Sequence, residues 1–171
     1  MNKMAIITQT ARITIREFLP EEETIYLDHF NDVLVTRYLP VRSREERINI
    51  FRAALEKYTT DKKTGTWGMF NTSDVGFIGS CLLRPFSNEA GVLELGYSME
   101  RKYWGMGIGT EMATAMVAHG FSDGNITQIV ALTDLDNIGS QRVLVKAGLI
   151  RGENLWKDGI ALAYFKTERS F

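Results

Sequence analysis

The sequence predicts an α/β protein of the α+β kind, with a mixed, mostly antiparallel sheet of about seven strands flanked by about four helices. Short apolar or alternating segments of strand length recur along the chain, and longer segments with helical apolar spacing lie between them. A glycine-rich loop joins one apolar strand to one of these helices. The 171 residues contain no internal repeat, linker or low-complexity stretch, which predicts a single domain over residues 1–171.

Composition limits the function classes. Hydrophobic residues make up 44% of the chain, and the net charge of −1 gives no electrostatic reason to expect a nucleic-acid partner. No apolar run approaches the roughly 20 residues that span a bilayer, and the N-terminus lacks the apolar region of a signal peptide. We therefore expect a cytoplasmic protein without a membrane partner. Cys81, the single cysteine, lies in an apolar run and is interpreted as a buried core thiol.

The chain begins with a predicted strand over residues 12–18, where apolar and polar residues alternate. Pro20 then starts a helix that should run to about Asn31, with glutamates in its first turn, where the helix dipole favours anions. His29 lies in this helix with no second metal-binding residue at ligand spacing. We expect a surface histidine and no metal site. Residues 33–42 are expected to form a loop or a short 3₁₀ segment.

A capping box predicts the start of the next helix, with Ser43 as the N-cap and Glu46 as the third following residue. It should end at residues 61–65. Two strands over residues 66–70 and 75–84 are predicted to pair antiparallel, because a turn-rich tetrad joins them.

The second half of the chain predicts the strand 92–99, the helix 108–121 and the buried strand 128–133. The methionines of the helix are interpreted as core filler. Asn137 opens a last helix, and Gly148 is well placed just after its end. The last two predicted strands cover residues 149–156 and 160–167, with a Lys-Asp-Gly turn between them.

The glycine loop predicts a phosphorylated cofactor. Gly105, Gly107 and Gly109 alternate between a strand and a helix, and glycine allows positive φ and close approach of a ligand. A helix N-terminus directs unpaired N–H groups and a positive dipole end at one point, which suits phosphate oxygens. A dinucleotide fingerprint would need glycine at Thr110, and a Walker loop would need Gly-Lys at Thr110 and Glu111, so the spacing excludes both.

The string Trp-Gly-Met-Gly-Ile-Gly-Thr resembles the pyrophosphate loop of the GNAT superfamily of N-acetyltransferases, which usually reads Gln or Arg, two residues, then Gly-x-Gly or Gly-x-Ala. Gly107 and Gly109 match this loop, whereas Trp104 stands at the Gln/Arg position. Tyr-Trp-Gly-x-Gly resembles the RimJ/RimL-type branch, which acetylates ribosomal-protein N-termini. Residues 136–149 resemble a second superfamily element, which runs from an asparagine to Gly-Phe or Gly-Leu. Together the two motifs imply a GNAT fold over roughly residues 11–169.

The resemblance also implies a site for acetyl-CoA. In the superfamily, the strands corresponding to residues 92–99 and 128–133 splay apart, and pantetheine enters the gap like an extra strand. Asn137 is placed both to cap its helix and to contact pantetheine, and the two roles are compatible. The cofactor-binding residues implied by the resemblance are Leu95, Gly96, Tyr97, Trp104, Gly105, Met106, Gly107, Ile108, Gly109, Thr110, Asn137 and Ser140.

The implied reaction is acetyl transfer to a primary amine by direct attack in a ternary complex. The amine must be neutral to attack, so a base is useful. Glu94, the one charge in an otherwise apolar strand, is the predicted base, and the alternative is a strand glutamate in solvent or in a salt bridge. Ser140 is the predicted acid for the leaving thiolate, because Leu144 stands where many relatives have tyrosine. Weaker candidates for the acid are Tyr97, Tyr103 and His119.

The acceptor stays open at this point. It is a protein or peptide N-terminus, or a small molecule such as a polyamine, amino sugar or amino acid. A CoA-binding sensor without turnover is a third possibility. The acceptor wall is expected in residues 33–42 and the final hairpin, where Arg37 and Tyr38 encode no readable specificity. The protein is expected to be a monomer or a homodimer.

Overall fold

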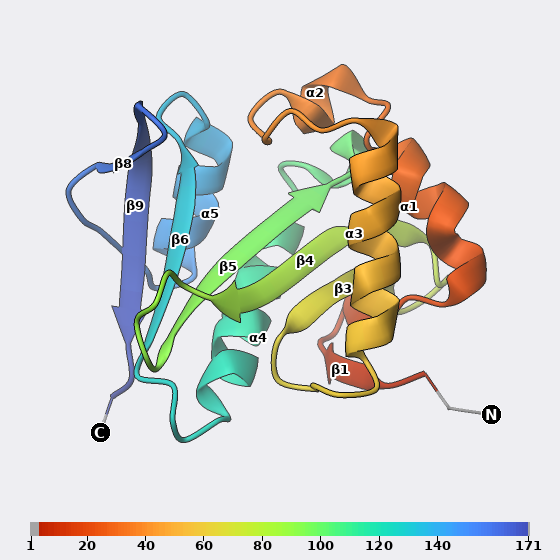
Figure 1. Cartoon of the computed structure of the whole chain (residues 1–171), viewed down its shortest axis with the longest axis horizontal. Helices are drawn as coiled ribbons and strands as arrows, with labels where there is room; N and C mark the ends of the chain where they lie inside the picture. Colours follow the sequence, from red (N-terminus) through yellow and green to blue (C-terminus); the bar gives the residue numbers. More distant parts are fainter. Residues whose placement is uncertain (1–3, 171) are drawn as a thin grey trace.

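A computed structural model of the protein describes residues 4–170 and shows a nine-stranded sheet with helices on both faces (Figure 1). The strands are β1 (Ile6–Gln9), β2 (Ile13–Arg16), β3 (Gly65–Asn71), β4 (Phe77–Pro85), β5 (Val92–Met99), β6 (Gln128–Asp134), β7 (Ile150–Arg151), β8 (Leu155–Lys157) and β9 (Ile160–Glu168). The α-helices are α1 (Glu23–His29), α2 (Val33–Thr36), α3 (Arg44–Lys57), α4 (Ile108–Phe121) and α5 (Ile138–Lys146). Two 3₁₀ helices, η1 (Pro20–Glu22) and η2 (Arg101–Tyr103), precede α1 and the glycine loop.

The sheet has the order β1-β2-β3-β4-β5-β6-β9-β7, and β8 also pairs with β9. Its strand pairs are antiparallel except for β5 and β6, which run parallel. This confirms the predicted mixed and mostly antiparallel sheet. Residues 4–170 form nine strands and five α-helices, where the sequence predicted about seven strands and four helices.

The two central strands separate as the resemblance implied. β5 and β6 pair only at Val92↔Gln128, Leu93↔Ile129 and Glu94↔Val130. Beyond Glu94 the two strands diverge, and Figure 1 shows the widening gap between them. The edge of β5 that faces this gap is therefore available to a ligand.

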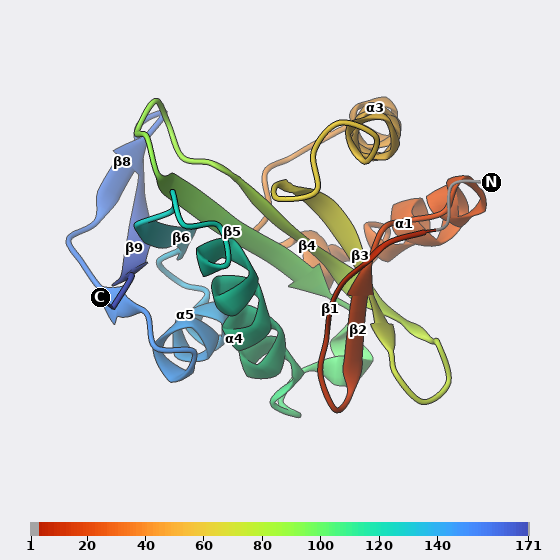
Figure 2. The ribbon, with the colours of Figure 1, turned by 90° about the horizontal axis from the view of Figure 1, so that it is seen from below.

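Helices α1 and α3 cover one face of the sheet, and α4 and α5 cover the other (Figure 2). On the first face, Phe18 packs against Tyr26 and Phe51 with ring centroids 5.5 and 5.3 Å away. On the second face, Met112 and Met116 are fully buried, which confirms their prediction as core filler. Burying an aromatic or methionine side chain contributes about 1.5–3 kcal/mol, so both layers stabilise the sheet that carries the gap.

Several local predictions are confirmed. Cys81 is buried, and burial raises the pKa of its thiol. Ser43 caps α3, since its hydroxyl accepts from the Glu46 N–H at 3.1 Å and the Glu46 carboxylate accepts from the Ser43 N–H at 2.6 Å. The helix ends at Lys57, however, four residues before the predicted stretch 61–65.

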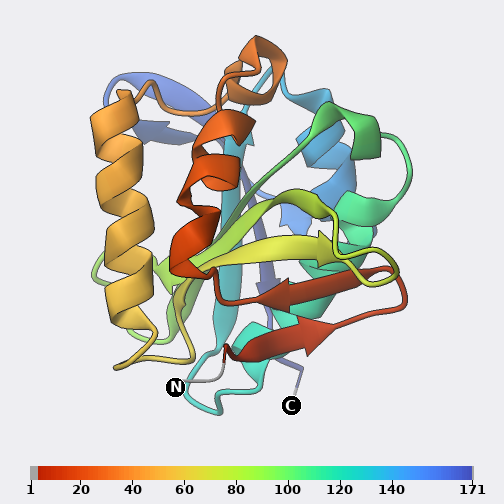
Figure 3. The same cartoon turned by 90° about the vertical axis from the view of Figure 1, so that its right-hand side faces the viewer.

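The sequence did not predict β1, which forms a hairpin with β2 at the edge of the sheet (Figure 3). Apolar and polar residues do not alternate in its sequence, Ile-Ile-Thr-Gln. No face of this strand is fully buried, and its register with β2 shifts, so alternation is not required. The predicted loop 33–42 begins with the short helix α2, because the Asp32 carboxylate accepts from the Leu34 N–H and caps it. The predicted strand 149–156 is divided into β7 and β8, which are separated by residues 152–154.

The prediction of a surface position for His29 is wrong. Only 4% of the residue is exposed, because it shares with Tyr26 the face of α1 that packs on the sheet. Its Nε2 lies 2.9 Å from the Ser98 hydroxyl on β5, and the Phe77 ring packs edge-on against the imidazole. The spacing of three residues from Tyr26 carried this information, since residues three apart share a helix face.

Candidate active site

The glycine loop presents unpaired backbone donors. Gly105 and Gly107 have φ values of 72° and 78°, a region that disfavours residues with a Cβ. Gly107 is the N-cap of α4 and supplies no side-chain cap. Within residues 4–170, the N–H groups from Gly105 to Thr110 have no hydrogen-bond acceptor. Such a helix end fits a phosphate group, whose oxygens would accept from these donors.

Glycine is required at the three loop positions for different physical reasons. A Cβ on Gly105 would meet open space, and one on Gly107 would meet Arg12 Nη2 at 3.4 Å, so their positive φ is the constraint. A Cβ on Gly109 would lie 3.0 Å from Val143 and 3.1 Å from Met99. Gly109 therefore allows α4 to approach α5 and β5 closely, which places the start of the helix at the mouth of the gap.

The side chain of Trp104 makes a hydrogen bond that stabilises the loop. Its indole Nε1 donates to the Met99 carbonyl at 2.9 Å, so the side chain ties the loop back to the end of β5. The residue is 45% exposed. An indole N–H is a donor only, and here it holds the loop in place beside the unpaired amides.

The β1–β2 hairpin forms hydrogen bonds with the glycine loop and the first turn of α4. The sequence did not predict this contact. Arg12 Nη1 donates to the Met106 carbonyl at 2.8 Å, and Arg12 Nε donates to the Glu111 carboxylate at 2.7 Å. Thr10 also donates to Glu111. Burial acts to raise the pKa of Glu111, but the hydrogen bonds from Thr10 and Arg12 hold it below the ordinary value. Because β1 has no clear strand pattern, no signal in the sequence joined this hairpin to the loop.

Tyr97 and Ser140 meet across the gap. The Tyr97 hydroxyl lies 2.8 Å from Ser140 Oγ, and it joins β5 to the first turn of α5. Burial raises the pKa of Tyr97 to about 12, with the hydrogen bond to Ser140 acting in the opposite direction. Asn137 caps this helix, since its Oδ1 accepts from the Ser140 N–H at 3.1 Å. Leu144, one turn further along α5, is buried in the core.

Glu94 lies at the point where β5 and β6 separate, and its carboxylate is paired. Arg84 on the neighbouring strand β4 donates to both carboxylate oxygens, at 2.9 and 3.1 Å. The Glu94 side chain is 13% exposed and that of Arg84 is 49% exposed. Since successive strand residues face opposite sides of a sheet, Glu94 and Tyr97 leave β5 on opposite faces.

The two remaining acid candidates do not reach Ser140. His119 lies near the far end of α4, about 18 Å along the helix axis from Gly107, and packs edge-on against Trp67. Tyr103 ends η2 and packs partly against the core. Of the candidate acids, Tyr97 alone is in contact with Ser140 within the described part of the chain.

Comparison with known proteins assigns this arrangement to a family. Residues 12–150 match the family described as the acetyltransferase (GNAT) domain, and this is most of the chain. The chain belongs to the GNAT acetyltransferase family. Among its GNAT relatives, the uncharacterised N-acetyltransferase YoaA of Bacillus subtilis is 26% identical over 161 residues, which cover 92% of this chain and 87% of YoaA. The protein is therefore an N-acetyltransferase.

Solved GNAT structures share the fold. The apo structure of RimL, a ribosomal L7/L12 alpha-N-protein acetyltransferase, gives a TM-score of 0.81 at 15% identity, over 97% of this chain and 95% of RimL. The aminoglycoside acetyltransferase AAC(6')-Ib gives 0.73 at 17% identity, over 92% of this chain and 95% of that enzyme. RimL and AAC(6')-Ib have both been solved in complex with coenzyme A.

Two features were not found among the described residues. No helix within residues 4–170 combines the length and apolar character needed to cross a membrane. In the same part of the chain, no three His, Cys, Asp or Glu side chains gather at a possible metal site.

Proposed function

We propose that this GNAT N-acetyltransferase uses acetyl-CoA to acetylate a protein or peptide N-terminus. The observation that carries the cofactor assignment is the set of unpaired amides from Gly105 to Thr110 at the mouth of the gap between β5 and β6. The acceptor assignment rests on the Tyr-Trp-Gly-x-Gly sequence and on the fold shared with RimL.

The residues of the loop and the gap fit coenzyme A in two places. The amides from Gly105 to Thr110 would hold the pyrophosphate, and the open edge of β5 at Leu95, Gly96 and Tyr97 would bind pantetheine by backbone hydrogen bonds. Trp104 and Arg12 hold the loop in the required conformation. When bound, acetyl-CoA supplies an activated acyl group with a thiolate leaving group.

Glu94 is the proposed base. Arg84 occupies one lone pair on each carboxylate oxygen, and each oxygen retains a second lone pair for a proton from the acceptor ammonium, directly or through water. Arg84 also fixes the orientation of the carboxylate. The placement of Glu94 at the apex of the gap supports this role.

Ser140 is the proposed proton donor to the leaving group, with Tyr97 as its partner. The pair at 2.8 Å allows Tyr97 to return a proton to Ser140 after Ser140 has given one to the thiolate, and solvent water then reprotonates Tyr97. The phenol is protonated at neutral pH, since burial raises the pKa of Tyr97 further above its ordinary value. A backbone N–H near Leu95 to Tyr97 would stabilise the negative charge that develops on the acetyl oxygen.

A small-molecule acceptor is the second candidate, favoured by the fold similarity to AAC(6')-Ib, which extends over 92% of this chain. The deciding experiment is an acceptor screen with acetyl-CoA, using peptides with free N-termini, the same peptides with blocked N-termini, polyamines, amino sugars and amino acids. We expect turnover with free N-termini alone. Faster turnover of a polyamine or amino sugar than of every peptide would assign the enzyme to the small-molecule class.

A further inference from the structure

The ion pair between Arg84 and Glu94 uses only one edge of the guanidinium group. Arg84 Nε donates to Glu94 Oε2 at 2.9 Å, and Nη2 donates to Oε1 at 3.1 Å. A guanidinium group carries N–H donors on both Nη atoms as well as on Nε, all fixed in one plane. Within residues 4–170, Arg84 Nη1 has no hydrogen-bond acceptor. The edge of the group that joins the two Nη atoms is therefore free to donate to a ligand.

This free edge lies beside the proposed base and is open to solvent. Arg84 is directly opposite Glu94 in the pairing of β4 with β5, so both side chains leave the sheet on the same face. The Arg84 side chain is 49% exposed and that of Glu94 is 13% exposed. Helix α1 covers the same face further along β5, where Ser98 contacts His29. The helices therefore leave Arg84 uncovered at the point where β5 and β6 begin to separate.

Glycine at position 96 leaves room beside the ion pair. Gly96 lies between Glu94 and Ser98 on the same face of β5 and pairs with Leu82 of β4. The nearest atoms to a Cβ added at Gly96 belong to the Leu82 side chain, at 3.2 Å. β6 does not pair with β5 at this position. An acceptor amine can therefore reach Glu94 over bare backbone, with the guanidinium group of Arg84 beside the carboxylate.

We propose that Arg84 is a specificity-determining residue, which selects an amine that carries a carbonyl group on its neighbouring carbon. This inference rests on the proposed function, in which Glu94 accepts a proton from the acceptor. While the ammonium group donates to a free lone pair of Glu94, the free edge of Arg84 donates to the carbonyl oxygen of the same residue. Only the Cα and the carbonyl carbon separate this oxygen from the amine nitrogen, so one residue spans the adjacent carboxylate and guanidinium groups.

The charge of Arg84 also disfavours other amines. A polyamine brings a further ammonium group instead of a carbonyl oxygen, and like charges repel. The side chain of an internal lysine offers only methylene groups near its amine. Lys166 lies on the same face of the sheet, but it is paired with Glu168 at 3.0 Å. Arg84 therefore favours the α-amine of a peptide N-terminus over the amines of polyamines and internal lysines.

Two acceptors and two enzymes test this role. The first acceptor is a peptide with a free N-terminus, and the second has an alkene in place of its first peptide bond and so lacks the carbonyl oxygen. Arg84→Met also releases Glu94, so kcat/KM should fall for both acceptors. We expect the ratio of kcat/KM for the peptide to that for the alkene to fall about tenfold in the variant, because a hydrogen bond from a charged donor is lost. The difference in pKa between the two amines is the same for both enzymes and cancels in this comparison.

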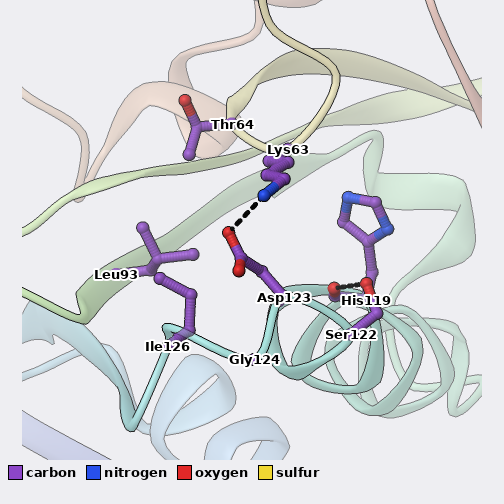
Figure 4. Close-up of a pocket in the computed structure, with 9 residues that line it drawn as sticks. Lys63, Thr64, Leu93, His119, Ser122, Asp123, Gly124 and Ile126 are labelled. Carbon is purple, nitrogen blue, oxygen red and sulfur yellow. Dashed lines mark hydrogen bonds and ion pairs between the residues drawn. The ribbon is translucent and has the colours of Figure 1, made fainter.

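Two further variants are controls. Arg52→Met removes a similar ion pair, since Arg52 Nε and Nη2 donate to the two carboxylate oxygens of Glu23. Lys63→Met removes the exposed ion pair between Lys63 and Asp123, which lines a cavity at the end of α4 (Figure 4). Neither variant should change the ratio. Arg84→Lys keeps the charge without the planar edge, and it measures the same loss if Arg84→Met does not fold.

The outcomes separate this inference from the proposed function. Acetylation of the peptide with the same ratio in the parent and in the Arg84 variants would overturn the role of Arg84 and leave the proposed function in place. Failure of the parent to acetylate any peptide would reject the proposed function, and the inference with it.

Discussion

The hydroxyl groups of Ser98 and Tyr97 extend from opposite faces of β5, and their surroundings differ. Ser98 meets the buried His29 at 2.9 Å on the face covered by α1. Tyr97 meets the half-buried Ser140 at 2.8 Å on the face covered by α5. Both strand positions pair with β4, and both lie beyond the residues of β5 that pair with β6. The first contact closes a packed layer, and the second spans an opening. One strand thus separates stabilising contacts from contacts available for chemistry simply by alternating its side chains.

The largest effect should come from Glu94→Gln, which keeps the shape of the side chain and removes the proposed base. We expect kcat/KM to fall about 10²–10⁴-fold, the usual range for general base catalysis, with little change in acetyl-CoA affinity. A pH series of kcat/KM for both proteins measures this, and the acidic limb of the parent should vanish in the variant. Glu168→Gln, which neutralises an exposed carboxylate paired with Lys166, is the control. A variant within threefold of the parent at every pH would make the Arg84–Glu94 pair structural.

Gly107→Val tests the glycine loop at the mouth of the gap that Tyr97 spans. Valine resists the φ of 78° and its branched side chain would cover the unpaired amides. The loss of two phosphate hydrogen bonds corresponds to acetyl-CoA binding that is about a hundredfold weaker. Gly159→Val is matched, because Gly159 has a φ of 77° in the turn between β8 and β9 with nothing within 4 Å of an added Cβ. If calorimetry shows equal CoA affinity for both variants, the phosphate site lies elsewhere.

On the face covered by α1, His29 should make the free energy of unfolding depend on pH. Burial lowers the pKa of His29 to about 4, with Arg47 acting in the same direction and Asp32 against it. The unfolded state therefore takes up the proton first as the pH falls. The stabilising contribution is complete above pH 6.5 and is lost progressively down to about pH 4, by an amount on the order of 3 kcal/mol. Urea unfolding at several pH values should show this slope in the parent and a flatter one in His29→Gln. The same slope in both proteins would contradict the assignment.

The smallest effect is expected for Tyr97→Phe, and it separates the two hydroxyl pairs directly. A thiolate is a tolerable leaving group, so losing the partner of Ser140 should lower kcat only about tenfold. Ser98→Ala should leave kcat unchanged and cost about 1 kcal/mol of unfolding free energy. Steady-state kinetics and urea unfolding on both variants measure the contrast. Equal kcat values in Tyr97→Phe and the parent would remove Tyr97 from the chemistry.

The parts of the site that were predictable from the sequence are those with local signals. Gly107 needs positive φ, Asn137 caps a helix, and both lie in short motifs, so their surroundings follow from neighbouring residues. The Arg84–Glu94 ion pair was foreseen only as an alternative, because it depends on which residue of β4 lies opposite Glu94. The contact between Arg12 and the loop joins residues 94 positions apart. No periodicity encodes such a contact.

That distant contact predicts that the N-terminal edge of the sheet responds to the cofactor. Arg12 and Thr10 hold the first turn of α4 through Glu111, so the local opening that would release β1 must also break bonds to the helix that begins at the loop. A ligand that binds the closed loop lowers the population of that opening by mass action. Amide hydrogen exchange in β1 and β2 should therefore slow when acetyl-CoA is added, although neither strand lines the gap. Protection confined to β5 and α4 would show that the hairpin opens independently of the loop.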